Sequence, residues 1–217
     1  MNSYSAKYTD RNSCEAITFN YDGEILQTTI RGVEFRGSEF DDLEPSNNTP
    51  VDLLKQFTFS DNALCSCCLE CEIPIDVCSQ DKIFPGILSI ALILGNPKPN
   101  GSIDCEQVQI TLTYNSNKFK SYGVSGWFEE ELLEIQAQLP KHTLMRICFN
   151  CLYSDYSPLG HGLFGCMMCF RNIKSEYLTV KSKADFWSIH NRYDRFVGET
   201  YCCSEFEPRI SGTDYGG

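Results

Sequence analysis

The sequence predicts an α+β domain of mainly antiparallel β-structure in a sandwich-like arrangement, with one clear amphipathic helix at residues 127–139. Three observations support this class. Runs of β-branched and aromatic residues recur through the first 114 residues, turn signals separate these runs, and one segment has a convincing helical spacing of apolar residues.

The first strands are predicted from a turn dipeptide. Residues 17–21 and 24–30 are rich in strand-forming side chains and flank Asp22-Gly23. This dipeptide is a strong hairpin signal because glycine tolerates positive φ. We expect the two runs to pair antiparallel, with residues 33–35 extending the sheet and residues 41–50 forming a polar loop.

A second β-rich block is predicted over residues 53–114. Apolar and polar residues alternate over residues 69–76, the pattern of a half-buried strand. Pro74 within that run argues for an edge position or a bulge. Residues 86–94 form a continuous apolar run, consistent with a buried strand, and residues 108–114 alternate again.

The helix is predicted from spacing. Four apolar residues lie on one face because they are four, three and four positions apart: Phe128, Leu132, Ile135 and Leu139. Glutamates fill residues 129–131, where the helix dipole favours anions, and Pro140 ends the helix. We expect it to pack on a sheet.

The remaining chain is predicted as strands at 143–153 and 196–206, a loop at 154–165, an ambiguous segment at 173–192 with one possible helical face, and a tail at 211–217. No linker separates two cores. We therefore expect one domain over residues 1–217, β-rich in residues 1–114 and rich in helix and cysteine in residues 115–217.

Charge restricts the classes of function. The net charge is −11, and residues 1–110 carry 7 Lys and Arg against 17 Asp and Glu. Such a surface repels phosphate, which disfavours nucleic-acid binding, and attracts a basic protein partner. The chain shows no secretion signal and no apolar run long enough to span a bilayer, so we expect a cytoplasmic protein without a membrane partner.

The 13 cysteines are candidates for metal ligands or buried thiols in a reducing compartment. Cys148 and Cys151 form a Cys-x-x-Cys pair, and Cys166 and Cys169 form a second pair fourteen residues later. Two such pairs resemble a zinc ribbon, since four thiolates close a tetrahedral shell. The alternative is that all four are simply buried.

A denser cysteine cluster occupies residues 65–71. Alternation places Cys65, Cys67 and Cys71 on one strand face and Cys68 on the other. Ligands along one extended strand lie too far apart to share an ion, so we expect a row of thiols facing the core.

Several longer motifs resemble an uncharacterised bacterial family that is sometimes found among toxin–immunity genes. They occupy residues 29–32 (TIRG), 69–74 (LECEIP), 148–165 (CFNCLYSDYSPLGHGLFG), 169–171 (CFR) and 199–206. The resemblance implies a domain of uncharacterised activity that covers most of the chain.

The same resemblance implies a specific set of cysteines, with Cys166 and Cys202 as departures from the family pattern. The expected ligands of one structural zinc ion are then Cys148, Cys151, Cys169 and Cys203, and Cys166 is the runner-up for the fourth position.

Two functions follow from these observations. The first is a non-enzymatic cytosolic binding protein, in its specific form an immunity-type inhibitor that uses acidic surface against a basic toxin. The alternative is a hydrolase-like enzyme centred on residues 148–169 that depends on a metal or on a cysteine, such as Cys151 paired with His161. No catalytic residue is assigned.

Overall fold

A computed structural model describes residues 1–80, 82–157 and 160–209. The described residues are mostly antiparallel β-structure with a few short helices, which confirms the predicted α+β class. The strands are β1 (Asn2–Asp10), β2 (Cys14–Tyr21), β3 (Leu26–Ile30), β4 (Val33–Gly37), β5 (Glu44–Pro45), β6 (Thr58–Ser60), β7 (Ala63–Cys65), β8 (Cys67–Ser79), β9 (Lys82–Leu94), β10 (Glu106–Tyr114), β11 (Asn117–Lys120), β12 (Thr143–Arg146), β13 (Ser154–Asp155), β14 (Cys166–Cys169) and β15 (Arg195–Gly198). The helices are α1 (Val51–Leu54), α2 (Phe128–Gln138), α3 (Lys174–Tyr177), α4 (Lys183–Ile189) and the 3-10 helices η1 (Cys148–Asn150) and η2 (Arg171–Ile173).

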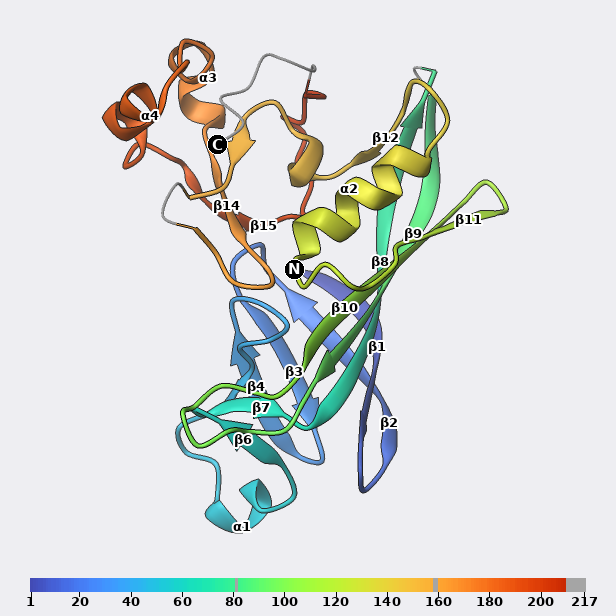
Figure 1. Cartoon of the computed structure of the whole chain (residues 1–217), viewed down its shortest axis with the longest axis vertical. Helices are drawn as coiled ribbons and strands as arrows, with labels where there is room; N and C mark the ends of the chain where they lie inside the picture. The colour runs from blue at the N-terminus through green and yellow to red at the C-terminus, as the bar shows by residue number, and fades with distance from the viewer. Residues whose placement is uncertain (81, 158–159, 210–217) are drawn as a thin grey trace.

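One large, twisted sheet organises the molecule (Figure 1). Its strand order is β11-β10-β9-β8-β1-β2-β3-β4-β5, and β12 also pairs with β8. The sheet curls around its own core: the ring of Phe57 contacts Tyr8 of β1 at 6.2 Å and Phe35 of β4 at 5.0 Å between ring centroids. This curling gives the sandwich-like form, because strands far apart in the sheet share one core.

The predicted N-terminal hairpin is confirmed, although it is short. Strands β2 and β3 pair antiparallel over two residue pairs, while β2 pairs along its whole length with β1, a strand that the sequence did not reveal. The Asp22 carboxylate accepts hydrogen bonds from the N–H groups of Glu24 and Ile25 at 2.9 and 2.8 Å. Gly23 has a φ of +110°, which favours glycine.

Pro74 lies at a local edge, as predicted. Strand β8 pairs with β1 as far as Glu72, and with β12 only from Asp76 onward. Pro74 therefore lies in the gap between β1 and β12, where β8 has no partner strand on that edge. Its missing N–H removes no hydrogen bond between strands there. On the other side β8 pairs with β9 without interruption.

Strand β9 differs from the fully buried strand predicted at residues 86–94. Leu88 and Leu92 are buried, but Ile87 and Ile93 are exposed. Successive side chains of a strand point to opposite faces, and only the inner face of this sheet packs against the core.

The predicted helix is confirmed as α2, one residue shorter at each end than residues 127–139. Phe128, Leu132 and Ile135 are buried, and α2 packs against β10 and β11. In Figure 1 it lies across one end of the large sheet. None of the helices within the described residues is both long and apolar enough to cross a membrane.

The C-terminal part is less regular than the sequence predicted. The strand predicted at 143–153 ends at Arg146, and the strand predicted at 196–206 ends at Gly198. The reason is a direct backbone connection between the two segments. The Cys148 N–H donates to the carbonyl of Tyr201 at 2.6 Å and the Phe149 N–H to that of Glu199 at 3.0 Å, so these groups are satisfied without a longer ladder.

The ambiguous segment 173–192 forms two short helices, α3 and α4, instead of one. Ser182 caps α4 by accepting a hydrogen bond from the Asp185 N–H at 3.2 Å. Both helices contribute to a second hydrophobic cluster that includes Phe170 and Phe186. The single domain over 1–217 stays a prediction, and the predicted tail at 211–217 lies outside the described residues.

Candidate functional site

The four cysteines predicted as zinc ligands come from three segments that meet in space. Cys148 belongs to η1, Cys151 follows it, Cys169 ends β14 and Cys203 lies beyond β15. The first three are buried and Cys203 is half-buried. Burial raises the pKa of the Cys148 thiol well above its ordinary value, and the thiols of the other three raise it further. These four side chains are therefore electrostatic neighbours.

In the part of the chain that the structure describes, no three or more His, Cys, Asp or Glu side chains are arranged to hold a metal ion. Arg171 lies beside Cys169 and Cys203 and pairs with Asp194 at 2.6 Å. Cys166, the runner-up ligand, has different neighbours, because its thiol donates a hydrogen bond to Glu39.

The cysteine row near residue 65 faces the core, as predicted. Cys65, Cys67 and Cys71 are buried, while Cys68 on the opposite face is half-buried. Burial raises the pKa of both Cys67 and Cys71 to about 12, so these thiols stay protonated at neutral pH. A thiol that is held protonated is a poor nucleophile.

A cluster of protonatable side chains, which the sequence did not reveal, joins the sheet to the C-terminal segment. The Cys166 thiol donates to Glu39 Oε1 at 2.8 Å. Glu199 accepts hydrogen bonds from the Gly165 N–H at 2.7 Å and from the Tyr156 hydroxyl at 3.3 Å. Both carboxyl groups line a cavity of ≈ 20 Å³, which has room for about one water molecule.

The electrostatics of this cluster disfavour cysteine catalysis. Burial raises the pKa of Glu39 to about 8, and burial together with the Glu39 charge raises that of Glu199 well above its usual range. Burial and Glu39 also raise the pKa of the Cys166 thiol. A thiol held protonated is a poor nucleophile, and the cavity is too small for a substrate.

The pairing of Cys151 with His161 finds no support in their surroundings. The His161 ring stacks on Tyr156 at 4.3 Å, and its Nε2 lies 3.5 Å from the carboxylate of Glu129. Cys151 lies instead in the group of thiols around Cys148.

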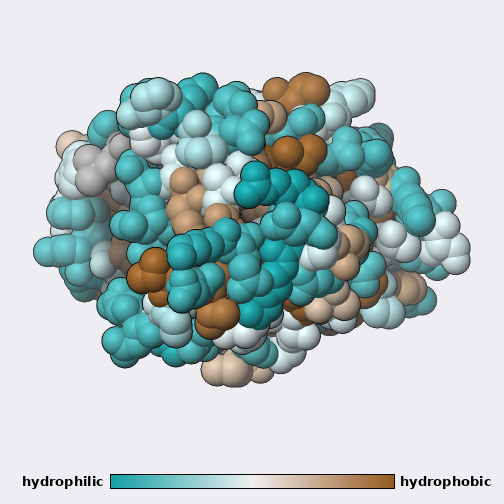
Figure 2. All heavy atoms as spheres, turned by 90° about the horizontal axis from the view of Figure 1, so that it is seen from below, coloured by the Kyte–Doolittle hydropathy of each residue, from teal (hydrophilic) through white to brown (hydrophobic). Residues whose placement is uncertain are grey.

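An acidic groove of ≈ 370 Å³ opens between the β6–β7 hairpin, the turn before β10 and the loop after β4. Asp41, Asp61 and Glu106 line it, and none of its described lining residues is Lys or Arg. The hairpin and turn lie near the lower end of the molecule in Figure 1, and the face seen from below in Figure 2 is mainly hydrophilic.

Two carboxyl groups of this acidic groove are close neighbours. Burial, together with the charge of Glu106, raises the pKa of Asp41 to about 7. Burial also raises the pKa of Glu106. A hydrogen bond with Asp41 lowers it, but the effect of burial is larger. Like charges this close disfavour joint ionisation, so a cation placed in the groove would favour the charged form of both groups.

Another open groove, of ≈ 490 Å³ on the outer face of the large sheet, has a mixed character. It is lined by Lys7 and Lys120 as well as by Glu70 and Glu72. Lys7 and Glu70 pair with each other. The acidic groove is therefore the more selective surface for a cation. No sequence pattern predicts that Asp41 and Glu106 meet, because they lie far apart in the chain.

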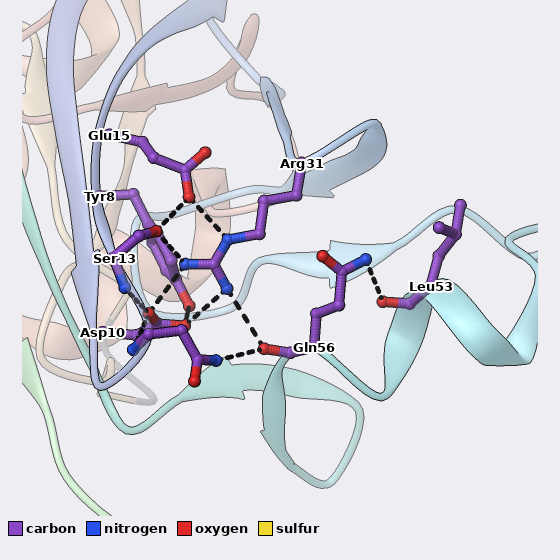
Figure 3. A network of polar contacts seen from close by, with 8 residues as sticks. Tyr8, Asp10, Ser13, Glu15, Arg31, Leu53 and Gln56 are labelled. Atoms are coloured by element: carbon purple, nitrogen blue, oxygen red, sulfur yellow. Dashed lines mark hydrogen bonds and ion pairs between the residues drawn. The ribbon is translucent and has the colours of Figure 1, made fainter.

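Arg31 forms a polar network at the turn between β1 and β2 (Figure 3). Its Nη1 and Nη2 donate to the two carboxylate oxygens of Asp10 at 2.9 and 2.8 Å, and its Nε donates to Glu15 at 2.6 Å. The guanidinium carbon also lies 5.4 Å from the ring centres of Tyr8 and Phe57. Because every polar part of Arg31 is occupied within the fold, we assign this network to stability and not to ligand binding.

Comparison with known proteins adds a family but no activity. A family model described as "Family of unknown function (DUF6304)" matches residues 2–154. No curated protein and no solved structure matches the chain. The matched region contains Asp41, Asp61 and Glu106, whereas Cys169 and Cys203 lie beyond it.

Proposed function

The chain belongs to DUF6304, a family of unknown function, and we propose that it is a non-enzymatic binding protein for a basic protein partner. The observation that carries the proposal is the acidic groove. Asp41, Asp61 and Glu106 converge there without a described Lys or Arg in the lining. A lysine or arginine side chain of a partner fits the charge of this site.

Electrostatics supports this choice of partner. A cation inserted into the groove would lower the pKa of Asp41 from about 7 and offset the charge repulsion between Asp41 and Glu106. The net charge of −11 would also speed the encounter with a basic protein. In the specific form implied by the sequence resemblance, the partner is a basic toxin and this chain is its inhibitor.

The test uses a fluorescein-labelled oligo-arginine peptide and fluorescence anisotropy. The groove variant carries Asp41→Asn, Asp61→Asn and Glu106→Gln. We expect it to bind the peptide at least about tenfold more weakly than the unchanged protein, which corresponds to about 1.4 kcal/mol. Raising the salt from about 50 to about 300 mM should weaken binding to the unchanged protein, because salt screens exposed charges.

A matched control separates the groove from net charge. It carries Glu24→Gln, Asp52→Asn and Glu72→Gln, three exposed positions outside the groove lining, and changes the formal net charge by the same amount. Equal losses in the groove variant and the control would contradict the proposal, since they would reveal general attraction without a site.

The proposal includes one structural zinc ion held by Cys148, Cys151, Cys169 and Cys203. Their convergence from three segments supports it. The ion would have to draw the four sulfur atoms to about 2.3 Å from its centre. Elemental analysis of protein purified without chelator should give about one zinc per chain, and about none for Cys148→Ser with Cys151→Ser. A ratio near zero for the unchanged protein refutes the ion and leaves the acidic groove unaffected.

A further inference from the structure

The segment 121–127 between β11 and α2 exposes three large apolar side chains. Tyr122 is 76%, Val124 77% and Trp127 43% exposed. Scattered apolar residues are normal on a protein surface, but here three occur within six consecutive residues. Tryptophan and tyrosine are also the residues most often found at the energetic centre of protein interfaces. This segment is therefore an unusual stretch of surface.

The first two turns of α2 hold the segment in place. The Glu131 side chain is fully buried and accepts hydrogen bonds from the Gly123 N–H at 2.8 Å, the Ser125 N–H at 3.1 Å and the Ser125 hydroxyl at 2.6 Å. Glu134 accepts another from the Tyr122 N–H at 2.7 Å. Two carboxylates thus fix the backbone beneath the exposed side chains.

Strand β10 holds the same segment from the other side. Gln109 donates to the carbonyl of Ser121 at 3.2 Å, and Ser121 exchanges hydrogen bonds with the backbone of Ile110. Gly123 has a φ of +72°, and a Cβ on it would lie 3.0 Å from the Gln109 Cβ, so this close approach requires glycine. A segment fixed before binding loses little conformational entropy when a partner arrives.

Charge indicates which kind of partner the segment fits. Residues 121–140 contain four glutamates and no Lys or Arg, with Lys120 and Lys141 on either side. Glu131 and Glu134 are used within the fold, whereas Glu130 is exposed three residues after Trp127. A second copy of the chain would bring another net charge of −11 to this surface. A partner with basic residues is electrostatically favoured over self-association.

We propose that segment 121–127 is the apolar anchor of a docking surface for a protein partner that offers an apolar face bordered by Lys or Arg. The inference rests on the proposed function in requiring a basic protein partner. It adds a second surface, with an apolar contribution that the acidic groove lacks.

The test uses Trp127 as its own reporter. Trp187→Phe leaves Trp127 as the only tryptophan of the chain. The probe is a synthetic amphipathic helix of Lys and Leu, and an isomer with scrambled order serves as the control peptide. We expect the probe to shift Trp127 emission to shorter wavelength and to reduce its quenching by acrylamide, because the indole leaves water on binding.

Two double variants in this background locate the contact. Tyr122→Ser with Val124→Ser removes the neighbouring anchors, and we expect at least about tenfold weaker binding of the probe. Val51→Ser with Ile83→Ser removes two other exposed apolar side chains and should leave binding unchanged. All four positions are exposed, so none of these changes disturbs the core.

The outcomes separate this inference from the proposed function. Equal affinity of both double variants, or binding of the probe without any change in Trp127 emission, overturns the docking surface. If oligo-arginine binding still depends on Asp41, Asp61 and Glu106, the proposed function stands without it. Conversely, loss of probe binding only in the Tyr122 and Val124 variant supports the docking surface even where the acidic groove proves inert.

Discussion

Replacing Arg31 with methionine should destabilise the protein far more than an ordinary surface substitution. The Arg31 and Asp10 side chains are only 13% and 6% exposed, and their ion pair is bidentate. Methionine keeps the apolar stem but leaves the Asp10 carboxylate without its cation. Asp10 keeps hydrogen bonds from the Asn12 and Ser13 N–H groups, so its charge stays partly satisfied.

The size of the loss follows from this geometry. Removing one partner of a buried ion pair costs about 3–5 kcal/mol. The Arg31–Asp10 pair is only partly buried, and Asp10 keeps other hydrogen bonds, so we expect the lower end of that range. A loss of about 3 kcal/mol should lower the melting temperature by about 6–12 °C for a chain of this length. Arg36→Met is the matched control, since Arg36 pairs with Glu34 at the surface and such a pair contributes about 0–1 kcal/mol.

Urea unfolding followed by circular dichroism measures both variants. The pH dependence gives a further check. Burial alone would raise the pKa of Asp10, but the hydrogen bonds from Arg31, Asn12 and Ser13 hold it below the ordinary value of 3.8. The stabilisation is therefore present above that value and is lost as pH falls below it, so unchanged protein and Arg31→Met should converge in acid. Similar losses for Arg31→Met and Arg36→Met at pH 7 would refute the reasoning.

Two further predictions concern buried carboxyl groups. Glu39 has a folded pKa of about 8 against an ordinary 4.5, so its contribution to stability is complete below 4.5 and is lost as pH rises through 8. In urea unfolding, the free energy of unfolding of Glu39→Gln should therefore rise by about 2–3 kcal/mol relative to that of the unchanged protein between pH 6 and pH 9. A difference between the two proteins that stays constant with pH would contradict the assignment. Glu131→Gln places an amide donor among the N–H groups of Gly123 and Ser125 and should cost about 2–3 kcal/mol. Hydrogen exchange of these two amides should accelerate, whereas the exposed neighbour Glu130→Gln should leave it unchanged.

Local chemistry explains which elements the sequence could predict. The face of α2 depends on residues three and four positions apart, and the turn at Asp22-Gly23 depends on two adjacent residues. The inward thiol row of Cys67 and Cys71 depends only on strand alternation. Each of these patterns lies within one short segment, so the local structure can be predicted without knowing what packs against that segment.

What the sequence determined by itself is the class of fold, the clear helix and the first hairpin. The tertiary structure decided where the late strands end, because Cys148 and Phe149 bond to Tyr201 and Glu199 across the fold. It also decided that Asp41 meets Glu106. Such contacts join residues far apart in the chain, and their free energy depends on the burial and the neighbours that only the folded chain supplies.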